Sequence, residues 1–210
     1  MGVNSRGKFI TLEGVDGAGK STHIPWIAEQ LRQGGEKGKR DVIVTREPGG
    51  TPLAEKLRAL VLSEPMDPLA ETLLMLAARA DHVQHVIRPA LERGAWVVCD
   101  RFTDATTAYQ GGGKGVSLEL IRRLSEAAHP GLMPDQTLVF DCPYDVSRSR
   151  LGASGRKLDR FEAEERGFFD RVRKAYQDLA VAEPVRVKII DGSKAKNEVK
   201  VEINKYLIRQ

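Results

Sequence analysis

Residues 14–21, Gly14-Val-Asp-Gly-Ala-Gly-Lys-Ser21, have the residue types and spacing of a loop that binds nucleotide phosphates. Its glycines let backbone N–H groups turn inward around an anion. The ammonium group of Lys20 would reach the β- and γ-phosphate oxygens, and the hydroxyl of Ser21 would bind Mg²⁺. The pattern therefore predicts a nucleotide-binding loop made of Gly14, Val15, Asp16, Gly17, Ala18, Gly19, Lys20 and Ser21.

Such a loop requires a strand before it and a helix after it, and the flanking residues predict both. Residues 8–13 form an apolar, β-branched run, and residues 21–32 carry apolar side chains at helical spacing. Further strands are predicted over 41–46, 95–100, 137–141 and 185–191. Further helices are predicted over 52–63, 68–94, 118–128, 145–150, 162–182 and 196–208. Pro89 should kink or end the long helix, and glycine-rich residues 111–115 should form a loop.

This alternation of strand and helix predicts an α/β fold, a five-stranded parallel sheet with helices on both faces. The length of 210 residues suits a single domain over residues 1–210. Ligands bind such sheets beyond the carboxyl ends of the strands. Asp100 ends an apolar strand, where a Walker-B carboxylate would hold Mg²⁺ through water, and Arg101 follows it.

The composition excludes several classes of protein. A formal net charge of +4 is too small to argue for nucleic-acid binding. No apolar run approaches the roughly 18 residues that span a bilayer, so no membrane partner is expected. The two cysteines, Cys99 and Cys142, lie in apolar stretches and exclude a disulfide framework. Buried thiols fit a reducing compartment, which favours a cytoplasmic location.

A phosphate-binding loop does not identify the reaction. The chain lacks the N-K-x-D segment that reads guanine in GTPase switches, and it is short for a large ATPase. A small metabolite kinase is favoured, and another nucleotide or nucleoside kinase and a regulatory ATP-binding module remain alternatives. His82 and His85 lie one helical turn apart but lack a third ligand, so they are interpreted as ordinary helix-face histidines rather than a metal site.

Four further segments narrow the choice. They are Thr45-Arg-Glu-Pro-Gly-Gly-Thr51, Asp100-Arg-Phe102, Ala108-Tyr-Gln-Gly-Gly-Gly-Lys-Gly115 and Leu158-Asp-Arg-Phe-Glu162. These four segments and the phosphate-binding loop occur together in the thymidylate kinase family, and the chain resembles its bacterial form over residues 8–176. The resemblance implies a nucleoside monophosphate kinase fold that phosphorylates dTMP to dTDP with ATP and Mg²⁺, a step in dTTP synthesis. It also implies a homodimer, for which helices 52–63 and 68–94 are the candidate interface.

The resemblance also implies roles for individual residues around dTMP. Asp16 would accept a hydrogen bond from the 3′-hydroxyl of the sugar. Arg46 would hold the region of the acceptor phosphate, close to Pro48, which would follow a cis peptide bond. Arg101 would clamp the dTMP phosphate, for which the guanidinium fork is suited. The remaining members of the expected dTMP site are Arg79, which would read the base, and Met75, Thr106, Tyr109 and Gln110.

Two departures from the family pattern carry information. Met75 stands where the family usually has a phenylalanine that stacks on thymine, so affinity for the base is expected to be lower. Gly17 stands where another branch of the family carries a loop arginine. Bacterial members place that arginine in a lid, here predicted over residues 152–160.

The lid residues complete the expected set. Arg156 is the expected catalytic arginine beside Lys20 and Asp100, with Lys157 and Arg160 as alternatives, and Arg150 would lie on the adenine. Glu13, which precedes the phosphate-binding loop, is either a supporting acid or a simple strand-end acid. No general base is required, because the second pKa of a phosphate monoester, about 6, leaves dTMP largely deprotonated at neutral pH.

Overall fold

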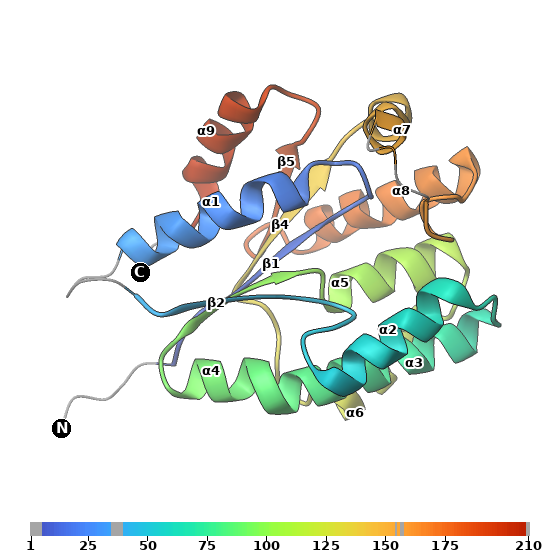
Figure 1. Ribbon diagram of the computed structural model, residues 1–210, viewed down its shortest axis with the longest axis horizontal. Coiled ribbons are helices and arrows are strands. Elements are labelled where there is room, and N and C mark those ends of the chain that lie inside the picture. Colours follow the sequence, from blue (N-terminus) through green and yellow to red (C-terminus); the bar gives the residue numbers. More distant parts are fainter. Residues whose placement is uncertain (1–5, 35–39, 154, 156–157, 209–210) are drawn as a thin grey trace.

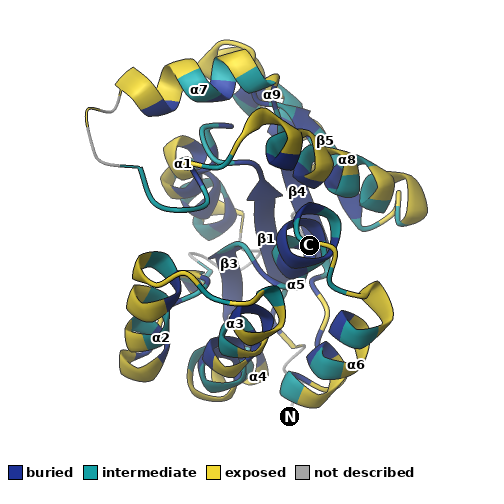
Figure 2. Ribbon diagram, turned by 90° about the vertical axis from the view of Figure 1, so that its right-hand side faces the viewer, coloured by how far each residue is buried: buried dark blue, intermediate teal, exposed yellow. Residues whose placement is uncertain are grey.

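A computed structural model describes residues 6–34, 40–153, 155 and 158–208. Its centre is the parallel sheet that the sequence predicts, with strand order β2-β3-β1-β4-β5. The strands are β1 (Phe9–Gly14), β2 (Val42–Arg46), β3 (Trp96–Asp100), β4 (Gln136–Asp141) and β5 (Val187–Asp191). Helices cover both faces of the sheet (Figure 1), and their outer surfaces are exposed while the three central strands are almost entirely buried (Figure 2).

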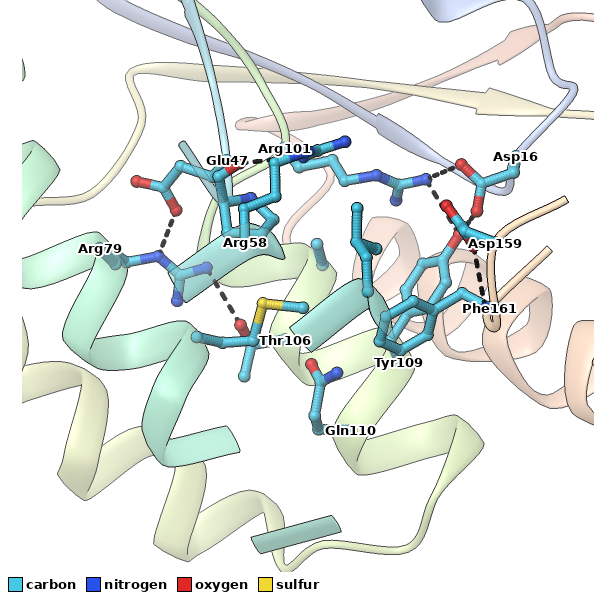
Figure 3. A pocket seen from close by; sticks show the side chains of 14 residues that line it. Asp16, Glu47, Arg58, Arg79, Arg101, Thr106, Tyr109, Gln110, Asp159 and Phe161 are labelled. Atoms are coloured by element: carbon cyan, nitrogen blue, oxygen red, sulfur yellow. Dashed lines mark hydrogen bonds and ion pairs between the residues drawn. The ribbon is translucent and has the colours of Figure 1, made fainter. Parts of the chain in front are cut away.

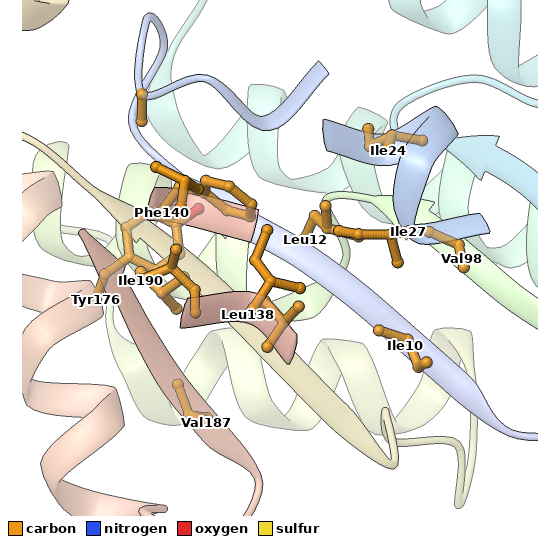
Figure 4. Close-up of a cluster of buried hydrophobic side chains, with 14 of the residues drawn as sticks. Ile10, Leu12, Ile24, Ile27, Val98, Leu138, Phe140, Tyr176, Val187 and Ile190 are labelled. Atoms are coloured by element: carbon orange, nitrogen blue, oxygen red, sulfur yellow. The ribbon is translucent and has the colours of Figure 1, made fainter. Parts of the chain in front are cut away.

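The alternation of side chains along β1 explains why the sheet needs cover on both faces. Ile10 and Leu12 lie in one apolar cluster with Ile24 and Ile27, as Figure 4 shows. Phe9, on the opposite face, lies in a second cluster that includes Ile87 and neighbouring apolar residues. Every residue of β1 is buried, which is typical of a central parallel strand.

The helices of the described residues follow the predicted positions with a few differences. They are α1 (Lys20–Gln33), α2 (Pro52–Ser63), α3 (Pro68–His82), α4 (Arg88–Glu92), α5 (Thr103–Thr106), α6 (Leu118–Ala128), α7 (Tyr144–Ala153), α8 (Arg166–Ala182) and α9 (Lys196–Tyr206). The predicted bounds of α2 and α6 are confirmed. The hydroxyl of Thr51 accepts a hydrogen bond from the backbone N–H of Ala54 and fixes the start of α2.

The long helix predicted over 68–94 is interrupted before Pro89. A π-helical segment, η1 (Val83–Ile87), lies between α3 and α4, and Pro89 occupies the first turn of α4. A proline removes one intrahelical hydrogen bond and its ring presses on the preceding turn, and the wider π turn accommodates both effects. The predicted effect of Pro89 is confirmed in kind, because the chain leaves the α-helical path in the turn before it.

The expectation of a loop over residues 111–115 is wrong for its first three residues. They end a second π-helical segment, η2 (Thr107–Gly113), which packs against α8. A Cβ atom on Gly112 would lie 2.6 Å from Cβ of Ala175, and one on Gly113 would lie 2.4 Å from a ring carbon of Phe168. These glycines therefore permit close helix packing rather than a turn.

The start of the predicted helix 162–182 also needs correction, because α8 begins at Arg166. The carboxylate of Asp159 accepts hydrogen bonds from the backbone N–H groups of Phe161 and Glu162, at 2.9 and 3.0 Å. These bonds hold residues 159–162 in a turn, which is how an aspartate competes with helix formation.

Candidate active site

The carboxyl ends of the strands border two neighbouring cavities. The larger, of about 690 Å³, is called here the phosphate cleft, and its lining includes Lys20, Ser21, Asp100 and Arg150. The smaller, of about 90 Å³, is called the inner pocket and is drawn in Figure 3. Its lining residues are Asp16, Glu47, Pro48, Arg58, Leu62, Met75, Arg79, Arg101, Ala105, Thr106, Tyr109, Gln110, Asp159 and Phe161. The two cavities share five of these residues: Asp16, Glu47, Arg58, Arg101 and Asp159.

The predicted phosphate-binding loop joins β1 to α1 and borders the phosphate cleft. Gly17 has a φ of 75°, and a Cβ atom there would lie 2.7 Å from the carbonyl oxygen of Ser147. Any larger side chain at position 17 would be strained, so this loop has no room for an arginine. Nζ of Lys20 donates hydrogen bonds to the carbonyl oxygens of Gly14 and Val15, each at 3.0 Å. Burial lowers the pKa of Lys20, and the charge of Arg101 acts in the same direction.

An ion pair marks the boundary between the two cavities. Nη2 of Arg101 donates to Oδ1 of Asp16 at 2.6 Å, and the hydroxyl of Tyr109 donates to Oδ2 of Asp16 at 2.9 Å (Figure 3). Burial alone would raise the pKa of Asp16, but the charges of Arg101 and Lys20 outweigh it and lower the pKa to about 2. The carboxylate is therefore ionised at neutral pH.

Arg101 is the one non-glycine residue among those described that has a positive φ, 72°. Its backbone N–H donates to the carbonyl oxygen of Leu12, which continues the β1–β3 pairing by one residue. The unusual backbone conformation turns the guanidinium toward the loop, where Nη1 donates to the carbonyl oxygen of Gly14 at 3.0 Å.

A buried guanidinium lies at the far side of the inner pocket. Arg79, only 4% exposed, donates from Nε to Oε2 of Glu47 at 2.6 Å and from Nη2 to the hydroxyl of Thr106 at 3.0 Å. Its third nitrogen, Nη1, is buried and has no hydrogen-bond partner among the described residues. Because an unpaired buried donor is costly, this nitrogen is available to a ligand that brings an acceptor.

The carboxylate of Asp100 fits a divalent cation. Its Oδ1 is buried and has no hydrogen-bond partner among the described residues, and the side chain borders the phosphate cleft with Ser21. Magnesium typically takes one or two protein oxygens and completes its shell with phosphates and water. A lone carboxylate with a nearby hydroxyl matches that donor set, and the described residues contain no group of three side chains that would form an all-protein metal site.

Three predicted residues lie at the edges of the site. Arg46 is half exposed, pairs with Glu55 at 2.9 Å and borders the phosphate cleft rather than the inner pocket. Arg150 also borders the phosphate cleft, where its Nη1 donates to the carbonyl oxygen of Gly192 at 2.7 Å. Gln110 lines the inner pocket while its amide donates to Glu71 at 2.8 Å.

The residues predicted to form a lid divide into two groups. Arg156 and Lys157 lie outside the described residues. Arg160 is described, and its guanidinium forms an ion pair with Glu71 of α3 and donates to the carbonyl oxygen of Val61 in α2. Arg160 lines neither cavity, so its position does not favour it as the catalytic alternative.

Several residues of the site were missed by sequence reasoning. Asp159 and Phe161 line the inner pocket, although the resemblance assigned no individual role to either residue. Arg58 lines both cavities from the middle of α2, and no sequence pattern distinguishes it from a surface arginine. Pro48 follows a cis peptide bond, as expected.

Glu13 supports the site from behind. It is fully buried, and its two oxygens accept hydrogen bonds from the N–H of Phe102 and the hydroxyl of Tyr176, both at 2.7 Å. Burial, with the charge of Asp104, raises its pKa to about 8. Glu13 lines neither cavity, but Tyr176 also contacts Arg101 at 3.4 Å. Glu13 therefore contributes to the packing beneath Arg101.

A family model, curated relatives and a solved structure all match this chain to the same family. The family model described as thymidylate kinase matches residues 12–203. The chain is 55% identical over 202 residues to a thymidylate kinase of Bordetella pertussis, covering 96% of this chain and 95% of the relative. It is 50% identical over 202 residues to one of Cupriavidus metallidurans, covering 96% and 98%. A crystal structure of thymidylate kinase from Ehrlichia chaffeensis superposes with a TM-score of 0.76 at 35% identity, covering 95% of this chain and 97% of that one.

Proposed function

The chain belongs to the thymidylate kinase family and phosphorylates dTMP to dTDP with ATP, and we propose that dTMP binds in the inner pocket and ATP in the phosphate cleft. The shared lining of the two cavities carries this proposal. Asp16 and Arg101 border both, so the acceptor phosphate of dTMP and the terminal phosphate of ATP would meet beside them. The inner pocket combines apolar lining residues such as Leu62 and Met75 with the charged groups of Arg79 and Arg101, as a nucleoside monophosphate requires.

On the ATP side, the backbone N–H groups of residues 14–19 would surround the β-phosphate at the start of α1. Lys20 would leave the loop carbonyls and pair with phosphate oxygens. Arg150 would lie on the adenine at the outer edge of the cleft. Ser21 and Asp100 would hold Mg²⁺, which supplies charge neutralisation when bound.

On the dTMP side, Arg79 would donate from its unpaired Nη1 to the thymine O4, and Met75 would cover a face of the ring. Asp16 would accept from the 3′-hydroxyl. Arg101 would bind the 5′-phosphate, with Arg46 near the same group at the cleft edge. Thr106, Tyr109 and Gln110 would complete the walls around the nucleoside.

The chain's own contribution to transfer is positioning and charge. Two anions must approach each other, and Lys20, Arg46 and Arg101 concentrate positive charge where they meet. Arg156 would add a further charge from a lid over residues 152–160. When the lid closes, it would exclude water that would otherwise accept the phosphoryl group.

We also propose that the protein is one domain, acts in the cytoplasm and forms a homodimer through α2 and α3. Leu53 and Leu60 of α2 and Leu69 and Leu73 of α3 are each more than 40% exposed, and the two helices pack on each other. A leucine surface of this kind is typical of a covered interface. Among the described helices, none is long and apolar enough to cross a bilayer.

Light scattering of Leu60→Asp should show a monomer, whereas Val185→Asp, at a site 90% exposed, should not change the assembly.

The experiment that tests the function is a coupled assay of ADP release with ATP, Mg²⁺ and each common nucleoside monophosphate. We expect dTMP to give the highest kcat/KM. Equal rates with several monophosphates would favour a broader nucleotide kinase. A protein that binds ATP but turns over none of them would favour the regulatory module.

A further inference from the structure

A chain of hydrogen bonds continues behind Arg79, away from the inner pocket. His82 ends α3, one helical turn after Arg79, and is fully buried. Its Nδ1 lies 2.9 Å from Oε1 of Glu47, and its Nε2 lies 2.7 Å from the hydroxyl of Thr45. Glu47 therefore joins two residues of α3, accepting from His82 on one oxygen and from Arg79 on the other.

The partners of His82 show which ring nitrogen must donate. Burial alone would raise the pKa of Glu47, but the charge of Arg79 and the hydrogen bonds it receives lower the pKa, so the carboxylate is an acceptor. Nδ1 of His82 must then carry the proton that it donates. Nε2 shares the second hydrogen bond with the Thr45 hydroxyl, which can donate to it or accept from it, so both ring nitrogens are satisfied.

Space for this arrangement depends on a glycine in the same loop. Gly50 has a φ of 86°, and a Cβ atom there would lie 2.5 Å from Nε2 of His82 and 2.8 Å from the Thr45 hydroxyl. A side chain at position 50 would push His82 away from Thr45. The loop that carries Glu47 is thus shaped to admit the imidazole.

The contact with His82 changes how Glu47 binds Arg79. An arginine and a carboxylate ordinarily form two parallel hydrogen bonds, which use both oxygens and two guanidinium nitrogens. Here Oε1 of Glu47 bonds His82 and Oε2 bonds Nε of Arg79, so each oxygen of the carboxylate is held by a different residue of α3. Nη2 of Arg79 bonds Thr106, and Nη1 is left without a described partner beside the pocket.

We propose that His82 is a positioning residue for base selection: by bonding one oxygen of Glu47 and the hydroxyl of Thr45, it fixes the carboxylate that holds Arg79 in the orientation that directs Nη1 at the base. This proposal rests on the role proposed above for Arg79. His82 touches neither substrate nor cavity, so its effect on the reaction passes through Glu47. Its substitution should therefore change recognition of the base more than transfer of phosphate.

Two substitutions of His82 separate this role from simple packing. The amide nitrogen of His82→Asn lies close to the place of Nδ1 and can still donate to Glu47, but it cannot reach Thr45. The amide of His82→Gln lies near the place of Nε2 and keeps the contact with Thr45 while losing the one with Glu47. Arg79→Ala is the reference for a lost base contact, and His85→Ala, at a side chain 64% exposed on the next helical turn, is the matched control.

Steady-state kinetics with dTMP and dCMP, and thermal unfolding of each variant, test the proposal. For His82→Gln we expect KM for dTMP to rise about 5–10-fold at little-changed kcat, the effect of one lost buried hydrogen bond. The ratio of kcat/KM for dTMP over dCMP should fall toward that of Arg79→Ala. His82→Asn should stay within about 3-fold of wild type, as should His85→Ala.

Four results would overturn the proposal. If Asn and Gln variants behave alike in kinetics and unfolding temperature, His82 only fills space. If His82→Gln lowers kcat and leaves KM unchanged, it does not act through the base contact. If Arg79→Ala itself leaves the dTMP-to-dCMP ratio unchanged, the proposed role of Arg79 fails, and that of His82 fails with it. A changed ratio in Arg79→Ala with an unchanged one in His82→Gln rejects only the role of His82.

Discussion

Nη2 of Arg101 lies 2.6 Å from Oδ1 of Asp16, and this pair stands where the inner pocket meets the phosphate cleft. The residue proposed to bind the 5′-phosphate and the residue proposed to bind the 3′-hydroxyl are thus partners before dTMP arrives. A carboxylate accepts about four hydrogen bonds, so Asp16 retains capacity beyond Arg101 and Tyr109. The ion pair fixes the distance between the two groups that must recognise the ends of one deoxyribose phosphate.

Asp16→Asn should reduce the penalty for omitting the 3′-hydroxyl of the substrate. In the wild type, the 3′-deoxy analogue of dTMP should have a kcat/KM about 10–100-fold lower than that of dTMP, because it loses a hydrogen bond to a charged acceptor. In the variant, this ratio should fall below about 10-fold, because the acceptor is neutral. Measuring kcat/KM for both substrates with both proteins tests it. An equal penalty in the two proteins would place the 3′-hydroxyl elsewhere.

Lys20→Ala should abolish turnover and leave the fold intact. Nζ donates its hydrogen bonds to two carbonyl oxygens of the phosphate-binding loop, and Lys20 belongs to neither apolar cluster, so the core loses little. ADP release and circular dichroism measure the two effects, and Lys205→Ala, on the exposed side of α9, is the control. Activity close to wild type in Lys20→Ala would remove this lysine from the mechanism.

Arg156→Ala should lower kcat by about 10³-fold while changing KM for dTMP little. An arginine that stabilises the charge on the transferred phosphoryl group is worth about 10³–10⁵ in kcat in related enzymes. Arg160→Ala is the comparison. Because Arg160 pairs with Glu71 rather than lining the phosphate cleft, we expect its kcat to fall less than about 10-fold. If Arg156→Ala raises KM and leaves kcat unchanged, Arg156 binds substrate only, and Lys157 or Arg160 takes the catalytic role.

The sequence predicted the fold well because β1 and its neighbours carry strong local signals. The apolar runs of the five strands and the glycine-rich loop after the first of them leave few alternative topologies. Gly111–Gly113 were misread because a glycine run has the same appearance whether it turns the chain or admits a helix. Only the position of α8, with Phe168 and Ala175 against these glycines, decides between the two.

The site was predicted where a motif carried it and missed where the fold assembles it. The phosphate-binding motif made Lys20 a candidate, and Arg101 was a candidate because it directly follows β3. His82 was interpreted as a helix-face histidine, because nothing in its local sequence shows that the residue is buried against Glu47, 35 positions earlier. The sequence likewise gives no sign of the partner of Arg160, since Glu71 lies 89 positions earlier, on α3.

Glu13 should make the stability of the protein fall as pH rises from about 5 to about 8. In the unfolded chain its pKa is near 4.5, whereas in the folded chain it is about 8. Between these values the folded state binds one more proton than the unfolded state, so the free energy of unfolding decreases with pH, by at most ~1.4 kcal/mol per pH unit from this group. Glu13→Gln, which resembles the protonated form, should flatten that slope in urea unfolding at pH 5.5, 6.5 and 7.5. Parallel slopes for the two proteins would contradict the prediction.

Arg79 should select bases by what they present at position 4. Its guanidinium only donates hydrogen bonds, thymine and uracil present an oxygen there, and cytosine presents an amino group. With dCMP, the buried Nη1 and the amino group would both lack a partner, at a cost of about 1–3 kcal/mol, or roughly 5–150-fold in kcat/KM. Uracil lacks only the 5-methyl contact, worth about 1–3 kcal/mol at most. We therefore expect kcat/KM to decrease in the order dTMP, dUMP, dCMP.

Arg79→Ala distinguishes the two kinds of selectivity. Because the variant removes the donor, the ratio of kcat/KM for dTMP over dCMP should shrink toward the value that methyl contact alone provides. The ratio for dTMP over dUMP should barely change, since both bases lose the same hydrogen bond to O4. The two ratios in wild type and variant, measured at saturating ATP, give the answer. If the dTMP-to-dCMP ratio stays at its wild-type value, Arg79 does not read the base, and its unpaired Nη1 must serve another part of the nucleotide.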